Sequence, residues 1–407
     1  MTLENCFQKA LARSETIGIH DEEIRIAEAH YLQALGMVLP HLDVQASEFI
    51  QDVPGASAAD GSVGSTLTRR TRPEVAVSLT HPLFQGFREF RALKISRTEK
   101  NRNSLDRKRA IQILFQDVAR AYYTVMELEQ ERAIQNSIRE TLARRIADLK
   151  NRISLGKSRA SELLSTESEI AALEADIAKT KGFVLTSRDY LAFLVGETVE
   201  ERLVDSFRLP GKVASLESYL EKSTTRPDIG ANREAVRLAK GQVDYEKGAR
   251  LPTVDFKANY YPVRVGFQSD IDWDLNFGMT LPIFHGGATR GKIREAQAEL
   301  KQSELTRLQS TRQAELEIRE AYHNFATART REAALNRAES KAGASYLAQT
   351  GEYTLGLVNN LQVLQSLHNW QQRQLDANQS RFETKLHYLA LLVASGEIPG
   401  LGEEATQ

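Results

Sequence analysis

The chain has 407 residues, of which 26% are charged, and its formal net charge at pH 7 is −1. This balance of acids and bases excludes a chain-wide attraction to nucleic acid or to anionic lipid. The longest uninterrupted apolar run, residues 388–394, is much shorter than the about 20 residues of a membrane-spanning helix. A single cysteine, Cys6, excludes an intrachain disulfide.

Cys6 is expected to be a buried position in an N-terminal helix. The residues before it, Leu3-Glu4-Asn5, lack the small side chains that precede a lipoprotein acceptor cysteine. The sequence also starts without the basic and then apolar segment of an export signal. We therefore expect either a cytoplasmic protein or one whose export signal is absent from this numbering.

Residues 40–84 contain two segments, 42–46 and 75–80, in which apolar and polar side chains alternate. A period of two gives a β-strand one apolar face and one polar face. The linker between the segments is polar and rich in turn-forming residues, with Pro54-Gly55 and a run from Gly61 to Thr68. This pattern predicts a pair of strands.

A basic segment follows at residues 88–109, which carry nine basic and three acidic side chains. A basic helix can bind nucleic acid, but aromatic side chains occur only near its start, as Phe87 and Phe90. The pattern favours a solvent-facing helix surface, and no nucleic-acid partner is expected.

Two long helical hairpins are predicted from apolar stripes. Apolar residues between 111 and 153 recur at steps of three and four, the spacing of a coiled-coil seam. The stripe ends at Leu155-Gly156, where glycine can adopt the left-handed conformation that terminates a helix. A second stripe follows, and a segment of mixed character at 196–227 then interrupts the repeat and is expected to form a small separate element with the tail after Ser395. A helix over 288–353, a turn at Leu355-Gly356 and a stripe from 361 onward repeat this plan.

Residues 252–284 hold the clearest strand pattern. Apolar residues alternate with polar or small ones over 254–260 and over 271–281, across a turn-rich linker. Strands of about 9–11 residues with this alternation are typical of transmembrane β-barrels, although a half-buried soluble sheet gives the same pattern. The position of both strand pairs between long helices favours the barrel. Four strands cannot close a barrel, and an open edge is excluded in lipid, so several copies of the chain must close it together.

The chain also contains an internal duplication. The segment PLFQG at 82–86 recurs as PIFHG at 282–286, and the Leu-Gly pairs at 155–156 and 355–356 have the same offset of 200 residues. Two further segments recur in the same order at offsets of 212 and 198 residues, those beginning at Leu39 and Tyr190. Landmarks in a constant order predict an architecture built from two equivalent halves.

Several motifs together resemble a known family. They are Thr2-Leu3-Glu4, the Leu-Pro pairs at 39–40 and 251–252, Arg226-Pro227-Asp228, and 281–287 followed by Arg290. With the duplication, they make essentially the whole chain similar to TolC-type outer membrane efflux proteins (outer membrane factors). The resemblance implies a mostly α fold with a β-barrel portion. Each protomer of a trimer would give four strands to one twelve-stranded transmembrane barrel, and its coiled-coil hairpins to an α-barrel tunnel.

The resemblance also implies how the chain divides. The barrel strands would lie in residues 40–84 and 252–284, and an equatorial region around the tunnel would comprise 196–227 and 395–407. The periplasmic helical barrel would take the remaining segments, which are 1–39, 85–195, 228–251 and 285–394.

Members of this family form the exit duct of a tripartite efflux pump or of a type I secretion system, and pass small molecules or proteins. The resemblance implies an outer-membrane location in a Gram-negative bacterium, with a long periplasmic portion. The expected partners are two further copies of the chain, outer-membrane lipid, a periplasmic adaptor (membrane fusion) protein and an inner-membrane RND or ABC pump. No catalysis, metal or cofactor is implied.

Site residues can be carried over by position. The two turns would be periplasmic tips that contact the adaptor through Leu155, Gly156, Lys157, Ser158, Leu355, Gly356, Leu357 and Val358. Glu162 and Tyr353 match an acidic residue and a tyrosine that latch the periplasmic aperture in the family. The family's arginine that completes this latch is absent, because Val358 occupies its position. Two aspartates that ring the aperture fall at Gln362 and Gln365. The closed aperture is then expected to depend on hydrogen bonds of Tyr353 and on packing of Leu361 and Leu364.

Other classes of protein share part of the pattern. A soluble coiled-coil scaffold would leave the alternating segments unexplained. A periplasmic adaptor usually has one helical hairpin, whereas this sequence predicts two hairpins and two strand pairs. Catalytic signals are weak, because no two histidines have the three- or four-residue spacing of a helical metal site. Gly286-Gly287 is expected to be a turn rather than a phosphate-binding loop.

Overall fold

The computed structural model describes residues 1–52, 70–266 and 268–399. They fold into two compact units. The hairpin unit comprises Met1–Ile19, Asp106–Ile229 and Ser310–Gln407, and the sheet unit comprises His20–Leu105 and Gly230–Gln309. The linker motifs Pro54-Gly55 and Gly61–Thr68, and the end of the tail at 400–407, lie outside the described residues.

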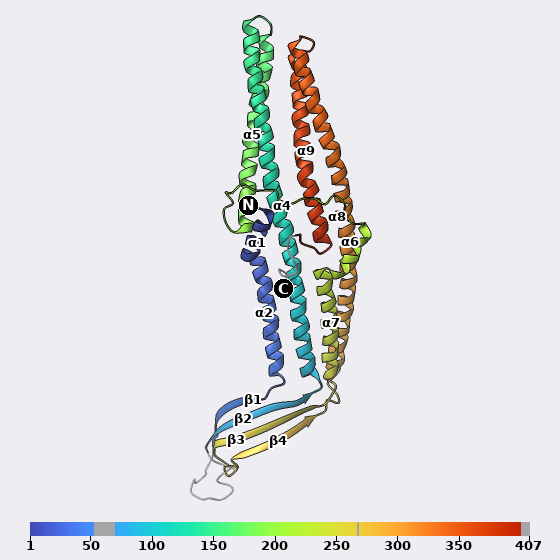
Figure 1. Cartoon of the computed structure of the whole chain (residues 1–407). Helices are drawn as coiled ribbons and strands as arrows, with labels where there is room; N and C mark the ends of the chain where they lie inside the picture. The colour runs from blue at the N-terminus through green and yellow to red at the C-terminus, as the bar shows by residue number, and fades with distance from the viewer. Residues whose placement is uncertain (53–69, 267, 400–407) are drawn as a thin grey trace. The chain divides into compact units, whose positions relative to one another are not determined.

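The long helices of the hairpin unit pair as two hairpins (Figure 1). Helix α4 (Arg88–Ser154) is followed by α5 (Ala160–Val195), and α8 (Ala288–Thr354) is followed by α9 (Asn360–Ala394). In the turns between them, Gly156 and Gly356 have φ values of 67° and 76°. This left-handed conformation strains residues that carry a Cβ and suits glycine. Both predicted hairpins and their glycine turns are confirmed.

The apolar stripes of the sequence hold the two hairpins against each other. Ile138 and Leu142 of α4, Leu173 of α5, and Leu364 and Leu367 of α9 form one buried cluster. Each buried leucine or isoleucine side chain contributes roughly 1.5–3 kcal/mol to stability. The apolar residues of the predicted seam therefore form the contact between the two hairpins as well as the contact between the helices of a hairpin.

Helix α1 (Leu3–Arg13) begins at Thr2, whose side chain caps it by accepting a hydrogen bond from the Asn5 N–H. Phe7 of this helix packs edge-on against Phe115 of α4, with ring centroids 5.2 Å apart. As predicted, Cys6 is buried, at 0% exposure, and burial raises the pKa of its thiol to about 11.

The segment that interrupts the repeat contains α6 (Leu216–Lys222) and a 3-10 turn, η1 (Ser223–Thr225), and is otherwise irregular. It is not separate from the hairpins, because its residues Val199 and Leu203 belong to the main buried cluster. The Tyr122 hydroxyl of α4 donates a hydrogen bond of 2.7 Å to the Val204 carbonyl. Lys222 forms an ion pair of 2.5 Å with Glu397 of the predicted tail.

The sheet unit contains one antiparallel sheet in the order β1-β2-β3-β4 (Figure 1). Its strands are β1 (His41–Ile50), β2 (Thr71–Gln85), β3 (Thr253–Arg264) and β4 (Trp273–Thr280). Both predicted strand pairs are confirmed, and they join through β2 and β3. Helix α2 (Glu15–Gly36) precedes β1, and α7 (Pro227–Gly248) precedes β3.

All four strands differ in length from the sequence prediction, and β1 and β3 extend beyond the predicted segments 42–46 and 254–260. The last strand is shorter than 271–281, because Thr280 pairs with Thr253, where β3 begins, and Ile271 donates to the Gln268 carbonyl in the preceding turn. Strand β2 is longer than 75–80, although Pro82 lies within it. The pairing with β3 shifts register at Pro82, where a residue without an N–H is tolerated.

The register gives the sheet one apolar and one polar face. Val44 lies opposite Val77, Phe256 opposite Phe277, and Tyr260 opposite Trp273, because residues paired across strands share a face. The other face carries alternate residues that are mostly polar, among them Asp43, Gln45, Ser78, Lys257, Asn259, Asp274 and Asn276. Within the described residues, every helix is too short or too polar to cross a membrane.

Candidate functional site

The two hairpin turns share one geometry. The Lys157 N–H donates to the Arg152 carbonyl at 2.8 Å, and the Leu357 N–H donates to the Glu352 carbonyl at 3.0 Å. These bonds satisfy carbonyls at the end of each first helix and leave the next side chains in solvent. Leu355 and Leu357 are 75% and 71% exposed, so large apolar side chains stand free at the second turn.

The structure divides the eight predicted docking residues into two groups. Six are exposed at the turns, namely Leu155, Gly156, Lys157, Leu355, Gly356 and Leu357. Ser158 and Val358 are half-buried and make contacts within the chain. The Ser158 hydroxyl donates to the Glu162 carboxylate at 2.7 Å, and Val358 packs against a buried cluster that includes Tyr353.

Glu162 and Tyr353 are brought together between the hairpins. The Tyr353 hydroxyl of α8 donates to the Glu162 carboxylate of α5, with 3.2 Å between the oxygens. Tyr353 is 6% exposed, and this burial raises the pKa of its hydroxyl, so the hydroxyl keeps its proton as a donor. The pair therefore links the tips of the two hairpins within one chain.

Two further residues at this junction are not identified from the sequence, Arg145 and Asn360. The Arg145 guanidinium lies 3.8 Å from the centroid of the Tyr353 ring, and its Nε donates to the Asn360 Oδ1 at 3.0 Å. The signal that could have found Arg145 is its place in the stripe, one turn after Leu142 and one turn before Leu149. A cation on the buried face of a helix needs a partner.

The two glutamines in place of the aspartates have different surroundings. The Gln362 side chain accepts a hydrogen bond of 3.0 Å from the Asn359 N–H, as part of a capping box at the start of α9. Gln365 is exposed and lines a groove of about 720 Å³ between α5 and α9, together with Leu164, Ser165, Ser168, Glu169, Leu361, Leu364 and His368. In the single chain, Leu364 is buried in the cluster with Ile138 and Leu142, whereas Leu361 is 60% exposed.

With the fold and the tips described, comparison with known proteins identifies the family. The family model of the outer membrane efflux proteins matches residues 6–197 and 222–397. The chain belongs to this family. The gap between the matched ranges falls inside the segment that interrupts the repeat.

An outer membrane efflux protein of similar sequence is BepC from Brucella suis biovar 1. It is 24% identical over 341 residues, which are 81% of this chain and 73% of BepC. Solved structures share the fold at lower identity. CusC superposes with a TM-score of 0.84 and 16% identity over 97% of this chain and 92% of CusC. VceC from Vibrio cholerae gives a TM-score of 0.81 and 18% identity over 97% and 96% of the two chains.

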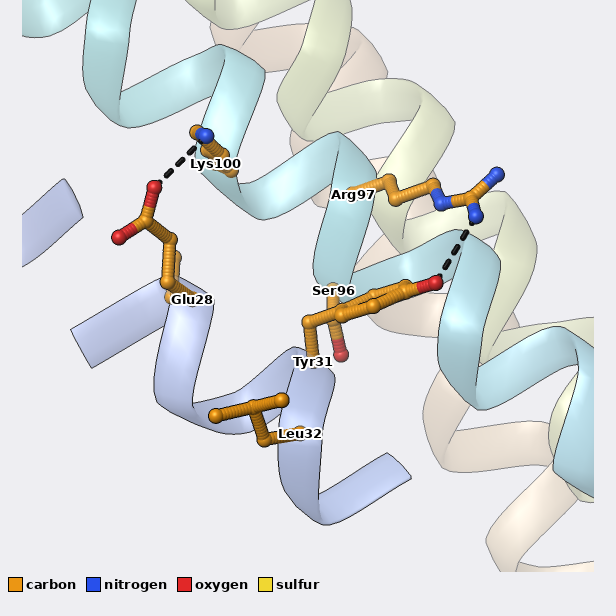
Figure 2. Close-up of a pocket in the computed structure, with 7 residues that line it drawn as sticks. Glu28, Tyr31, Leu32, Ser96, Arg97 and Lys100 are labelled. Carbon is orange, nitrogen blue, oxygen red and sulfur yellow. Dashed lines mark hydrogen bonds and ion pairs between the residues drawn. The ribbon is translucent and has the colours of Figure 1, made fainter. Parts of the chain in front are cut away.

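The basic segment of this outer membrane efflux protein packs against its neighbouring helices. A groove of about 410 Å³ lies between α2 and α4, and Figure 2 shows side chains that line it. There Lys100 pairs with Glu28 at 2.7 Å, and an Arg97 Nη donates to the Tyr31 hydroxyl at 2.9 Å (Figure 2). On the side of α7, the Arg88 guanidinium lies 4.2 Å from the centroid of the Tyr245 ring. These contacts assign part of the positive charge to helix packing, whereas the sequence predicts a solvent-facing surface.

Proposed function

We propose that this outer membrane efflux protein works as a homotrimeric exit duct, and that three copies close one barrel in the outer membrane. The single observation that carries the proposal is the sheet, which has an exposed apolar face, a polar face and, among the described residues, two edges without a partner strand. All ten residues of β1 are exposed, including Leu42, Val44, Phe49 and Ile50. In an isolated soluble chain, such a surface would promote aggregation.

Closure by neighbouring copies satisfies both edges. Lipid offers no hydrogen bonds to free backbone groups, so the edges of β1 and β4 must pair with other strands. An even number of strands per chain keeps the pairing antiparallel when β4 of one copy meets β1 of the next. Two copies would give an eight-stranded barrel, whose interior is filled by side chains, whereas three copies give room for a channel. The polar face would then line this channel.

The hairpin unit supplies the periplasmic part of the proposal. We propose that the helices of three copies form a tunnel and that the six exposed tip residues dock on a periplasmic adaptor protein. The adaptor would connect the duct to an inner-membrane RND or ABC pump, in a tripartite efflux system or a type I secretion system. The apolar side chains of Leu155, Leu355 and Leu357 support this role, because exposed leucines at a helix turn are suited to burial against a partner.

Purified protein in planar lipid bilayers tests the proposal. We expect stepwise ion conductance from an assembly that runs as a trimer on an unheated gel and as a single chain after heating. Crosslinking in cells should capture an adaptor and an inner-membrane pump together with the chain. A protein that stays in the soluble fraction as a single chain, or that gives no conductance when assembled, would contradict the proposal.

A further inference from the structure

The ring of Tyr353 lies close to two arginines of the other hairpin. The Arg145 guanidinium is 3.8 Å from the ring centroid, and the Arg152 guanidinium is 4.9 Å away. Arg152 also has an acidic partner, Asp148, at 3.1 Å on its own helix. Arg145 has no carboxylate within ion-pair distance among the residues that the structure describes. The Tyr353 ring is therefore its main electrostatic partner.

Arg145 has a second contact that closes a circuit between the hairpins. Its Nε donates to the Oδ1 of Asn360, which is 1% exposed at the start of α9. The Nδ2 of Asn360 donates back to the first hairpin, to the Glu162 carbonyl and to the Thr166 hydroxyl, each at 3.2 Å. Glu162 in turn accepts the hydrogen bond from the Tyr353 hydroxyl. Arg145 thus holds both residues of the second hairpin, Tyr353 and Asn360, against Glu162.

We propose that Arg145 is a positioning residue of the closed aperture, and that its guanidinium on the first hairpin fixes Tyr353 and Asn360 of the second. The proposal rests on the proposed function, because it assumes that the hairpin tips form the aperture of a channel. Arg145 acts through Tyr353 and Asn360. It fixes the ring so that the hydroxyl reaches Glu162, and it fixes the amide at the base of α9.

We call the contacts of Arg145 with Tyr353 and Asn360 the clamp. Their chemistry also explains how the two hairpins can separate. The face of an aromatic ring attracts a cation, and the attraction is larger where water is excluded. The Arg145 Nη2 is nevertheless buried without a hydrogen-bond partner in the described residues, and burial lowers the pKa of the guanidinium by disfavouring its charged form. Separation of the hairpins would hydrate this cation. Hydration of Arg145 in the open state would therefore offset part of the stabilisation that the clamp gives to the closed state.

The test compares two neighbouring arginines in planar bilayers. Arg145→Ala should shift the assembled channel toward its open level, with an increase in the open-to-closed ratio on the order of tenfold. The matched control is Arg144→Ala, since Arg144 is exposed on the same helix and bonds only to Thr141, at 3.1 Å, among the described contacts. The control should leave the ratio unchanged.

Two further variants separate positioning from a general loss of stability. Arg145→Lys keeps a positive charge over the ring but loses the planar contact to Asn360, so it should open the channel less than Arg145→Ala. Because Arg145 acts through Tyr353 as well as Asn360, adding Arg145→Ala to Tyr353→Leu should cause less further opening than Arg145→Ala causes alone. A general destabilisation would instead make the two effects additive.

The outcomes are distinguishable. The inference is overturned if Arg145→Ala and Arg145→Lys conduct like the wild type while Tyr353→Leu opens the channel, or if the double variant is additive. If Arg145→Ala does not assemble, Arg145→Lys decides, and an unchanged open-to-closed ratio overturns the inference. A wild-type assembly without any conductance would overturn the proposed function itself, and the clamp with it.

Discussion

Leu275 and Asn276 are neighbours on β4 that face opposite sides of the sheet. Leu275 pairs with Ala258 on the apolar face, and Asn276 pairs with Lys257 on the polar face. Leu275→Arg should cost roughly 2–4 kcal/mol if the site lies near the middle of the bilayer, whereas Asn276→Arg should be tolerated in a water-filled channel. The amount of heat-modifiable trimer in isolated outer membranes measures the difference. Equal amounts for both variants would contradict a lipid-facing sheet.

At the residue scale, the sequence predicts a single pair of interacting residues better than it predicts a network of contacts between hairpins. Glu162 and Tyr353 could be matched by position, and the structure brings them together. Arg145 could not be matched, because its partners Tyr353 and Asn360 are more than 200 residues away and are set by packing between hairpins. The sequence predicts a latch without an arginine at Val358, and the structure places the guanidinium of Arg145, on α4, 3.8 Å from the Tyr353 ring centroid.

At the scale of the element, the hairpin turns carry a second prediction. Gly156 has a φ of 67°, and within the described part of the chain no atom beyond its two neighbours lies within 4 Å of a Cβ added there, so a substitution would strain only the backbone. Gly156→Val should therefore abolish export and leave the trimer intact. Gly182→Ala is the control, since Gly182 also has open space around it but lies within α5 with ordinary helical geometry. Normal export by variants with bulky residues at both tip glycines would exclude docking through these turns.

Helix α4 also carries a carboxyl group that makes stability depend on pH. The pKa of Glu127 is raised to about 7, first by burial and then by the nearby charges of Glu383 and Glu131. Because the pKa is higher in the folded state, ionisation of Glu127 disfavours folding. Stability should therefore rise as the pH falls from about 8 toward the unfolded-state pKa of about 4.5.

Thermal unfolding of the purified trimer in detergent measures this dependence. Glu127→Gln should raise the melting temperature at pH 8 and flatten its change between pH 8 and pH 5. Glu174→Gln, at an exposed position of α5, should behave like the wild type. If Glu127→Gln retains the full pH dependence, another group is responsible.

Local sequence patterns predict which helices and strands form, but they do not predict the residues at which these elements begin and end. The stripes, the turn glycines and the alternation of Val254–Tyr260 predict the helices and strands, because these signals depend on a few neighbouring residues. The end of β4 is set by the start of β3, which is a partner about 27 residues earlier. The segment at 196–227 shares its core with α1, α4 and α5, a packing that no local pattern indicates.

At the scale of the whole molecule, the two halves of the duplicated sequence fold into equivalent sets of elements. Each half provides two strands and one long helical hairpin with a glycine turn. The halves differ at the second helix of each hairpin. Asn359 and Gln362 form a capping box at α9, whereas Arg159 gives α5 no side-chain cap. A capping box therefore fixes the start of α9, whereas the hydrogen bonds of Glu162 hold the start of α5.

The central claim is that three copies of the chain close one barrel. Native mass spectrometry of protein extracted from the outer membrane measures this most directly. We predict a complex of three 45.6 kDa chains that remains whole until the sample is heated. Leu275→Arg should reduce the yield of this complex, and Asn276→Arg should not. A single chain or a pair of chains, recovered under conditions that keep other outer-membrane barrels assembled, would contradict the account.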